Sequence, residues 1–185
     1  MGYGEAWWFL RDSGEASLDE AVTALRDAGL VAGNPATGVQ QVIDDDGRQV
    51  PWDDAEVRRR WAVGESVTVQ FWVNRETDVL VELMRPDQLV TFDLDGMTTA
   101  EARLTVFAVL NAALSLAGTQ AVVVAGSLPD RGDDLRATMA GGWSKAGLPF
   151  TPDLLVSVEG DGQYSMNVRV GSWLSKPAAT VQSFR

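Results

Sequence analysis

Apolar residues recur at every second position over three consecutive stretches, 67–73, 79–83 and 88–94. This period is that of a β-strand with one buried face. Only a few residues separate each stretch from the next, and links this short join antiparallel neighbours. The pattern therefore predicts an antiparallel meander over 66–94.

The spacing of apolar residues changes to a helical period over 18–28 and again over 98–117. Ser17 and Thr98 open these stretches, and a glutamate follows each of them three residues later, which is the spacing of a capping box. The second stretch is apolar around most of its circumference, as in helices that are buried on more than one side. We therefore expect a long buried helix over 98–117 that lies across the sheet and is covered from behind.

Shorter segments add elements before and after this centre. Aromatic residues predict a strand over 5–10, and a wholly apolar run predicts a central strand over 120–125. The remaining predictions are a short strand over 39–43, a helix from Asp53 or Asp54 to about Trp61, a helix over 134–143, and a hairpin of strands over 154–158 and 164–170.

These elements together predict the α+β fold class. We expect a single domain over 1–175, in which a mostly antiparallel mixed sheet carries the 98–117 helix. A chain of 185 residues with 45% hydrophobic residues is long and apolar enough to bury a core of this kind. Residues 176–185 are polar and are expected to form a loose tail.

The charge of the chain restricts the kind of partner that it binds. A net charge of -11 repels phosphate backbones, so we expect no nucleic-acid partner. The same negative charge attracts basic proteins. The opening residues lack the regions of a signal peptide, and no apolar run reaches membrane-spanning length. We therefore expect a cytoplasmic protein with a basic protein partner and no membrane partner.

The chain contains neither cysteine nor histidine. This removes disulfides, thiolate ligands, the commonest metal ligand and the usual general base. An enzyme built from this chain would have to work with carboxylates, Lys, Arg, Tyr, Ser or Thr. The spacing of an EF-hand is absent around Gly47, Gly96 and Gly162, so we predict no metal and no cofactor.

An acidic cluster precedes the run Arg58, Arg59 and Arg60. It contains the candidate partner contacts, which are Asp44, Asp45, Asp46, Trp52, Asp53 and Asp54. Two interpretations are open for it. The acids either form a surface for a basic protein, with the tryptophan as an anchor, or pair locally with the arginines and form only a solvated face.

Asp93 and Asp95, followed by Gly96, stand between an apolar strand and a helix. This motif resembles the first motif of the haloacid dehalogenase-like phosphatases. The resemblance implies that Asp93 is the phosphoryl-accepting nucleophile and Asp95 a general acid, with Mg²⁺ bound between protein and phosphate. Looser matches assign phosphate binding to Ser127, charge neutralisation to Lys145 and metal binding to Asp161. A structural interpretation is also open, in which these aspartates only make the turn into the helix.

The chain also resembles small actinobacterial-type proteins of uncharacterised families, some of them regarded as immunity proteins of polymorphic toxin systems. The resemblance rests on the opening MGYGEAWWFLR, on TDVLVEL, on LDGMTTAEA before the long helix, and on AVVVAG. It implies a non-enzymatic protein that neutralises a toxin domain by contact. A third hypothesis is that the protein is a structural or chaperone-like subunit of a larger assembly.

Overall fold

The structure, a computed structural model, describes residues 3–11, 18–84, 88–126, 150–159, 163–169 and 172–174. Nine strands and three helices lie within these ranges. The strands are β1 (Glu5–Leu10), β2 (Gln41–Ile43), β3 (Gln49–Pro51), β4 (Val67–Trp72), β5 (Asp78–Met84), β6 (Leu89–Asp93), β7 (Thr119–Ala125), β8 (Leu154–Val158) and β9 (Tyr164–Val168). The helices are α1 (Leu18–Asp27), α2 (Asp54–Ala62) and α3 (Thr99–Ser115).

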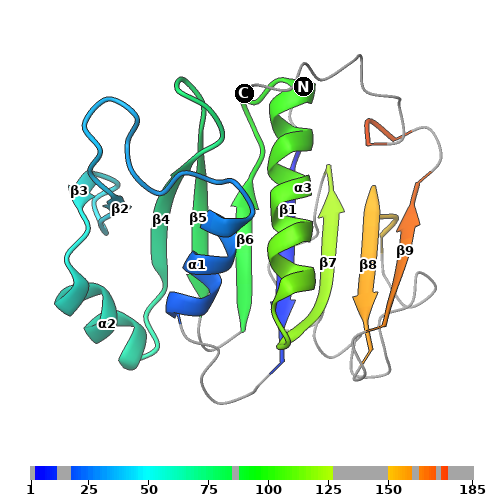
Figure 1. Ribbon diagram of the computed structural model, residues 1–185, viewed down its shortest axis with the longest axis horizontal. Helices are drawn as coiled ribbons and strands as arrows, with labels where there is room; N and C mark the ends of the chain where they lie inside the picture. Colours follow the sequence, from blue (N-terminus) through cyan, green and yellow to red (C-terminus); the bar gives the residue numbers. More distant parts are fainter. Residues whose placement is uncertain are drawn as a thin grey trace.

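All nine strands form one sheet in the order β3-β2-β4-β5-β6-β1-β7-β8-β9 (Figure 1). Every pairing between these strands is antiparallel, so the predicted mixture of parallel and antiparallel pairs is wrong for the described sheet. Strands β4, β5 and β6 pair in chain order. The first strand, β1, lies between β6 and β7, and both of these are much later in the sequence.

Helices α1 and α3 pack against each other on one face of the sheet, as Figure 1 shows. We call this face the helix side. Strand β1 sends Ala6, Trp8 and Leu10 into the main core on the helix side, and all three are at most 5% exposed. Its alternate residues Trp7 and Phe9 are buried on the opposite face, in a second cluster that includes Val123 and Leu155. Burial on both faces explains why 6–10 is apolar without interruption.

Helix α3 begins with the predicted capping box. The Thr98 hydroxyl accepts a hydrogen bond from the Glu101 amide at 3.4 Å, and the Glu101 carboxylate accepts one from the Thr98 amide at 2.8 Å. The helix is not covered on every side, however, because Leu104, Phe107 and Leu114 are 45%, 56% and 38% exposed. These residues share the outer stripe of the helix, and α1 and the sheet contact other sides.

Glu101 joins the start of α3 to the loop between β4 and β5. Its carboxylate accepts hydrogen bonds from the Thr77 hydroxyl, from Thr98 and from Asn74. The Thr77 bond is the largest cause, followed by Thr98, by which the pKa of Glu101 is lowered from 4.5 to about 2. Because the ionised form is favoured in the folded state, this stabilisation is present above pH 4.5 and is lost as the pH falls toward 2.

We expect the free energy of unfolding to fall more steeply between pH 4.5 and pH 2 in the native chain than in Glu101→Gln. The glutamine keeps the size of the side chain and cannot titrate. Urea unfolding at a series of pH values measures the difference. Parallel curves for the two proteins would show that Glu101 does not link folding to protons.

Several predictions concern residues outside the described ranges: the cap at Ser17, the helix over 134–143 and the tail over 176–185. Strand β3 was not predicted, although the turn before it was. Two of the tryptophans, Trp7 and Trp8, are buried, whereas Trp52, Trp61, Trp72 and Trp173 are half-buried. The described tryptophans therefore serve packing, and Trp52 retains an accessible part.

Candidate functional site

The predicted acidic cluster lies at one end of the sheet, where the β2–β3 hairpin and α2 come together (Figure 1). The hairpin turn is built by Asp44. Its carboxylate accepts hydrogen bonds from the amides of Asp46 at 3.0 Å and Arg48 at 2.8 Å. Gly47 completes the turn with φ of 77°, a conformation that glycine adopts without strain. Asp44 therefore stabilises the hairpin turn.

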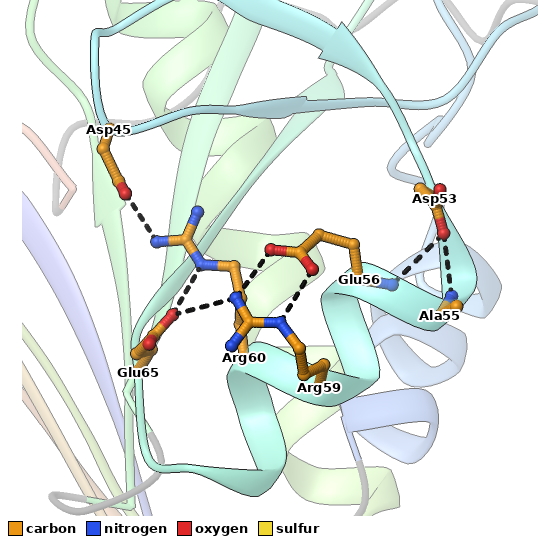
Figure 2. Close-up of polar contacts among 7 residues, drawn as sticks. All are labelled: Asp45, Asp53, Ala55, Glu56, Arg59, Arg60 and Glu65. Atoms are coloured by element: carbon orange, nitrogen blue, oxygen red, sulfur yellow. Dashed lines mark hydrogen bonds and ion pairs between the residues drawn. The ribbon is translucent and has the colours of Figure 1, made fainter.

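Asp53 starts the neighbouring helix. Its carboxylate accepts hydrogen bonds from the amides of Ala55 at 3.0 Å and Glu56 at 3.1 Å, as Figure 2 shows. These amides have no partner within the helix, so an aspartate at this position stabilises the first turn. Asp53 is the cap of α2, in agreement with the prediction that Asp53 or Asp54 opens this helix.

Ion pairs connect the hairpin turn to α2. Arg60 lies 2.7 Å from Asp45 of the turn and 3.2 Å from Glu65 beyond the helix (Figure 2). Arg59 lies 2.8 Å from Glu56 one turn earlier in the helix. The side chain of Arg60 is only 20% exposed, whereas that of Asp45 is 87% exposed. The arginine therefore holds a carboxylate that remains open to solvent.

Trp52 and Asp54 form the other part of the cluster. The Asp54 carboxylate accepts hydrogen bonds from the Trp52 indole at 3.1 Å and from Arg58 at 3.0 Å. The Arg58 bond, more than the Trp52 bond, holds the pKa of Asp54 below its usual range. Arg58 also reaches Asp19 of α1 at 2.8 Å. The tryptophan ring is thus held beside an ionised carboxylate.

All six candidate contacts lie along one edge of the sheet, the turn acids near the last turn of α2 and the other three residues at its first turn. The structure also shows the local pairing that the alternative interpretation predicted, because Asp45, Asp46 and Asp54 each pair with an arginine. The two arrangements are compatible: these three side chains are still 65% or more exposed. Over residues 44–65 the chain has seven acids and four arginines, so the surface stays negative after pairing.

The phosphatase-type residues are placed differently. Asp93 accepts a hydrogen bond from the Asp95 amide at 2.9 Å, and Asp95 accepts one from the Gly4 amide at 3.2 Å. The first bond closes the turn between β6 and α3, as the structural interpretation predicted, and the second joins this turn to the residue that precedes β1. Strand β6 is antiparallel to both of its neighbours. The other residues of the resemblance, which are Ser127, Lys145 and Asp161, lie outside the described residues.

Two partners of the cluster were missed from the sequence. Asp19 is 39 residues from Arg58, and Glu65 follows α2 in a stretch without any motif. Within the described ranges, no three carboxylates are grouped in a way that would hold a metal ion. Nor is any helix in the described part of the chain both long and apolar enough to cross a bilayer.

Comparisons of the chain with protein-family models, with curated proteins and with solved structures found no match.

Proposed function

We propose that the protein is a non-enzymatic binding protein of the cytoplasm whose acidic end contacts a basic protein. In its most specific form, the proposal is that of an immunity protein that neutralises a toxin domain by contact. One observation carries it: exposed acids lie at both ends of α2 along one edge of the sheet, Asp45 of the hairpin turn beside its last turn and Asp54 beside Trp52 at its first turn. In this proposal, the meander over 66–94 and the long helix over 98–117 serve as the scaffold.

The arginines support this proposal because they fix the acidic side chains. A surface whose carboxylates are already held loses less conformational entropy when a partner binds. The remaining negative charge attracts a basic partner over a distance of about one Debye length, about 8 Å at physiological ionic strength. Trp52 adds an apolar anchor of the type that contributes most to binding energy in protein interfaces.

A phosphatase that uses Asp93 is the second candidate. The motif at the end of β6 is its only support, and the carboxylates of Asp93 and Asp95 are engaged by backbone amides. Mg²⁺-dependent hydrolysis of a phosphate ester that Asp93→Asn abolishes would favour this candidate. A structural or chaperone-like subunit is the third, and a stable complex without any toxin component would favour it.

The test of the favoured function neutralises the acids that the fold does not need. Asp45→Asn, Asp46→Asn and Asp54→Asn combined leave the turn residue Asp44 and the helix cap Asp53 intact. We expect this triple variant to bind the cognate partner at least 10-fold more weakly, chiefly through slower association, and with a smaller dependence on salt. The partner is first captured from a lysate of the source cells at low salt, and binding is then measured by surface plasmon resonance.

A matched control removes three charges elsewhere. Asp27→Asn, Glu76→Gln and Glu159→Gln are exposed positions outside the cluster. If only total charge mattered, both triple variants would weaken binding equally. If neither changed affinity or salt dependence, the acidic end would not be the binding surface.

A further inference from the structure

The two edges of the sheet differ in how they are protected against pairing with another strand. At one edge, β3 has only three residues and ends in Pro51. The backbone hydrogen bonds from Asp44 to Arg48 and from Trp52 to Gln40 show that the amides and carbonyls of even-numbered residues in β3 point toward β2. Residue 51 therefore faces outward, where proline removes the donor that an added strand would use. This edge is blocked.

The opposite edge, β9, has none of these protections. Its five residues, Tyr164, Ser165, Met166, Asn167 and Val168, include no proline and no charge. All five are exposed, and among the described strands no other pairs with its outer side. Natural proteins usually block an edge of this kind with charge, proline or a bulge. An open, uncharged edge is therefore a surface where another strand can add.

The phase of β9 is fixed by hydrogen bonds at both ends of the β8–β9 hairpin. The Glu159 amide donates to the Gln163 carbonyl at 2.7 Å, and the Arg169 amide donates to the Asp153 carbonyl at 2.9 Å. The backbone amides and carbonyls of odd-numbered residues in β9 thus point toward β8, because the direction of these groups alternates along a strand. The amides and carbonyls of 164, 166 and 168 point away from the sheet and are available to a further strand.

The same three residues present apolar side chains. Tyr164, Met166 and Val168 are 55%, 47% and 41% exposed. They lie opposite Val158, Val156 and Leu154 in β8, so they continue the apolar helix side of the sheet to its edge. An added strand would thus gain backbone hydrogen bonds and apolar neighbours at the same three positions.

We propose that the partner of this edge is β9 of a second copy of the chain, paired antiparallel with Met166 opposite Met166. In this register Tyr164 faces Val168 of the other copy at both ends, a favourable aromatic and β-branched pair. All outward groups at 164, 166 and 168 then find partners, which makes the strand self-complementary. The two sheets become one continuous sheet across a two-fold axis.

The distribution of charge favours a second copy at this place. A chain of net charge -11 repels its own copies, so association requires an uncharged contact far from the acids. Strand β9 is uncharged, and it is at the opposite end of the strand order from the acidic β2–β3 hairpin. Pairing through β9 places the two acidic ends as far apart as the sheet allows and leaves both accessible.

Disulfide crosslinking tests this register directly, because the chain has no cysteine of its own. In Met166→Cys the two Cα atoms would be about 5.5 Å apart, within the range that a disulfide spans. In Tyr164→Cys the two cysteines would be about 13 Å apart along the strands and cannot bond within the pair. Under mild oxidation we expect Met166→Cys to form a covalent dimer at least 10-fold faster than Tyr164→Cys.

A charge exchange at the two-fold axis is the second test. Met166→Lys and Met166→Glu each place like charges opposite each other, so each variant alone is expected to remain a single chain. An equimolar mixture is expected to recover a mass of twice 19.9 kDa, because lysine then faces glutamate. Val63→Lys, at a 63% exposed position just after α2, is the control that should keep the dimer of the native chain.

Sedimentation from about 1 µM to about 1 mM covers the affinities of small interfaces and gives the mass of the native chain. A native chain that stays at 19.9 kDa throughout would overturn the proposal. So would a dimer that persists in Met166→Lys, or crosslinking of Tyr164→Cys as fast as that of Met166→Cys. The amide of residue 166 donates no hydrogen bond to β8, so these substitutions are expected to leave the fold intact. Circular dichroism of each variant checks that the monomer has folded.

Discussion

Replacing Trp8 with alanine is expected to lower the free energy of unfolding by about 4 kcal/mol, the middle of the range for large aromatic side chains in cores. Trp8 is 0% exposed and lies in β1, an interior strand of the sheet. Its indole donates a hydrogen bond to the Thr119 hydroxyl at 2.9 Å. The alanine would leave a cavity under the helices and remove this bond. Urea unfolding, followed by circular dichroism, measures the change.

Trp8→Phe separates the two contributions. It keeps most of the packing and loses the hydrogen bond, so a loss of about 1.5 kcal/mol is expected. Trp52→Ala provides a comparison at a half-buried position and should cost less than Trp8→Ala. If Trp8→Ala cost less than 1 kcal/mol, as surface substitutions do, β1 would not be a tightly packed interior strand.

Replacing Arg169 with alanine is expected to cost about 3 kcal/mol, at the low end of the range for breaking a buried ion pair. Arg169 pairs with Asp153, whose side chain is only 4% exposed, at 2.5 Å. Removing the arginine leaves a buried carboxylate without its cation. The loss is limited because the Arg169 side chain is itself 47% exposed. Chemical denaturation at neutral pH gives the difference.

Removing the charge of Asp153 provides the matched control. Asp153→Asn in the Arg169→Ala background takes away the unpaired charge, so the double variant should be more stable than Arg169→Ala alone. The pair would be unimportant for folding if the single variant unfolded at the same urea concentration as the native chain. A double-mutant cycle with Asp153→Asn alone then gives the coupling energy of the pair.

The strands and helices were largely predictable because their patterns are local. Val67, Val69 and Phe71 alternate with polar residues because their side chains point to the core. Thr98 and Glu101 have the spacing of a capping box, which is typical of a helix start. The exposure of Phe107 was not predictable. An apolar residue on the outer stripe of α3 is indistinguishable in sequence from one that faces the sheet.

Pairing between distant residues could not be predicted either. Several strands of the sheet are equally apolar, so no pattern indicates that β1 lies between β6 and β7. In the acidic cluster, the turn at Asp44 and the cap at Asp53 follow from local spacing. The bridge from Arg58 to Asp19 depends on how α1 and α2 are placed by the fold, and this information is not present in either segment alone.

The position of β1 also has a consequence for the order in which the chain folds. This strand precedes both of its partners in the chain, and the residues that it pairs with in β6 and β7 are 80 to 120 residues further along. Contacts of such sequence separation close large loops before they gain any energy, which slows folding. Trp7 and Trp8 have no partner strand until β6 has been made, and β1 is not flanked on both sides until β7 follows. Until then, nascent chains carry an exposed aromatic strand, the kind of apolar surface that chaperones protect.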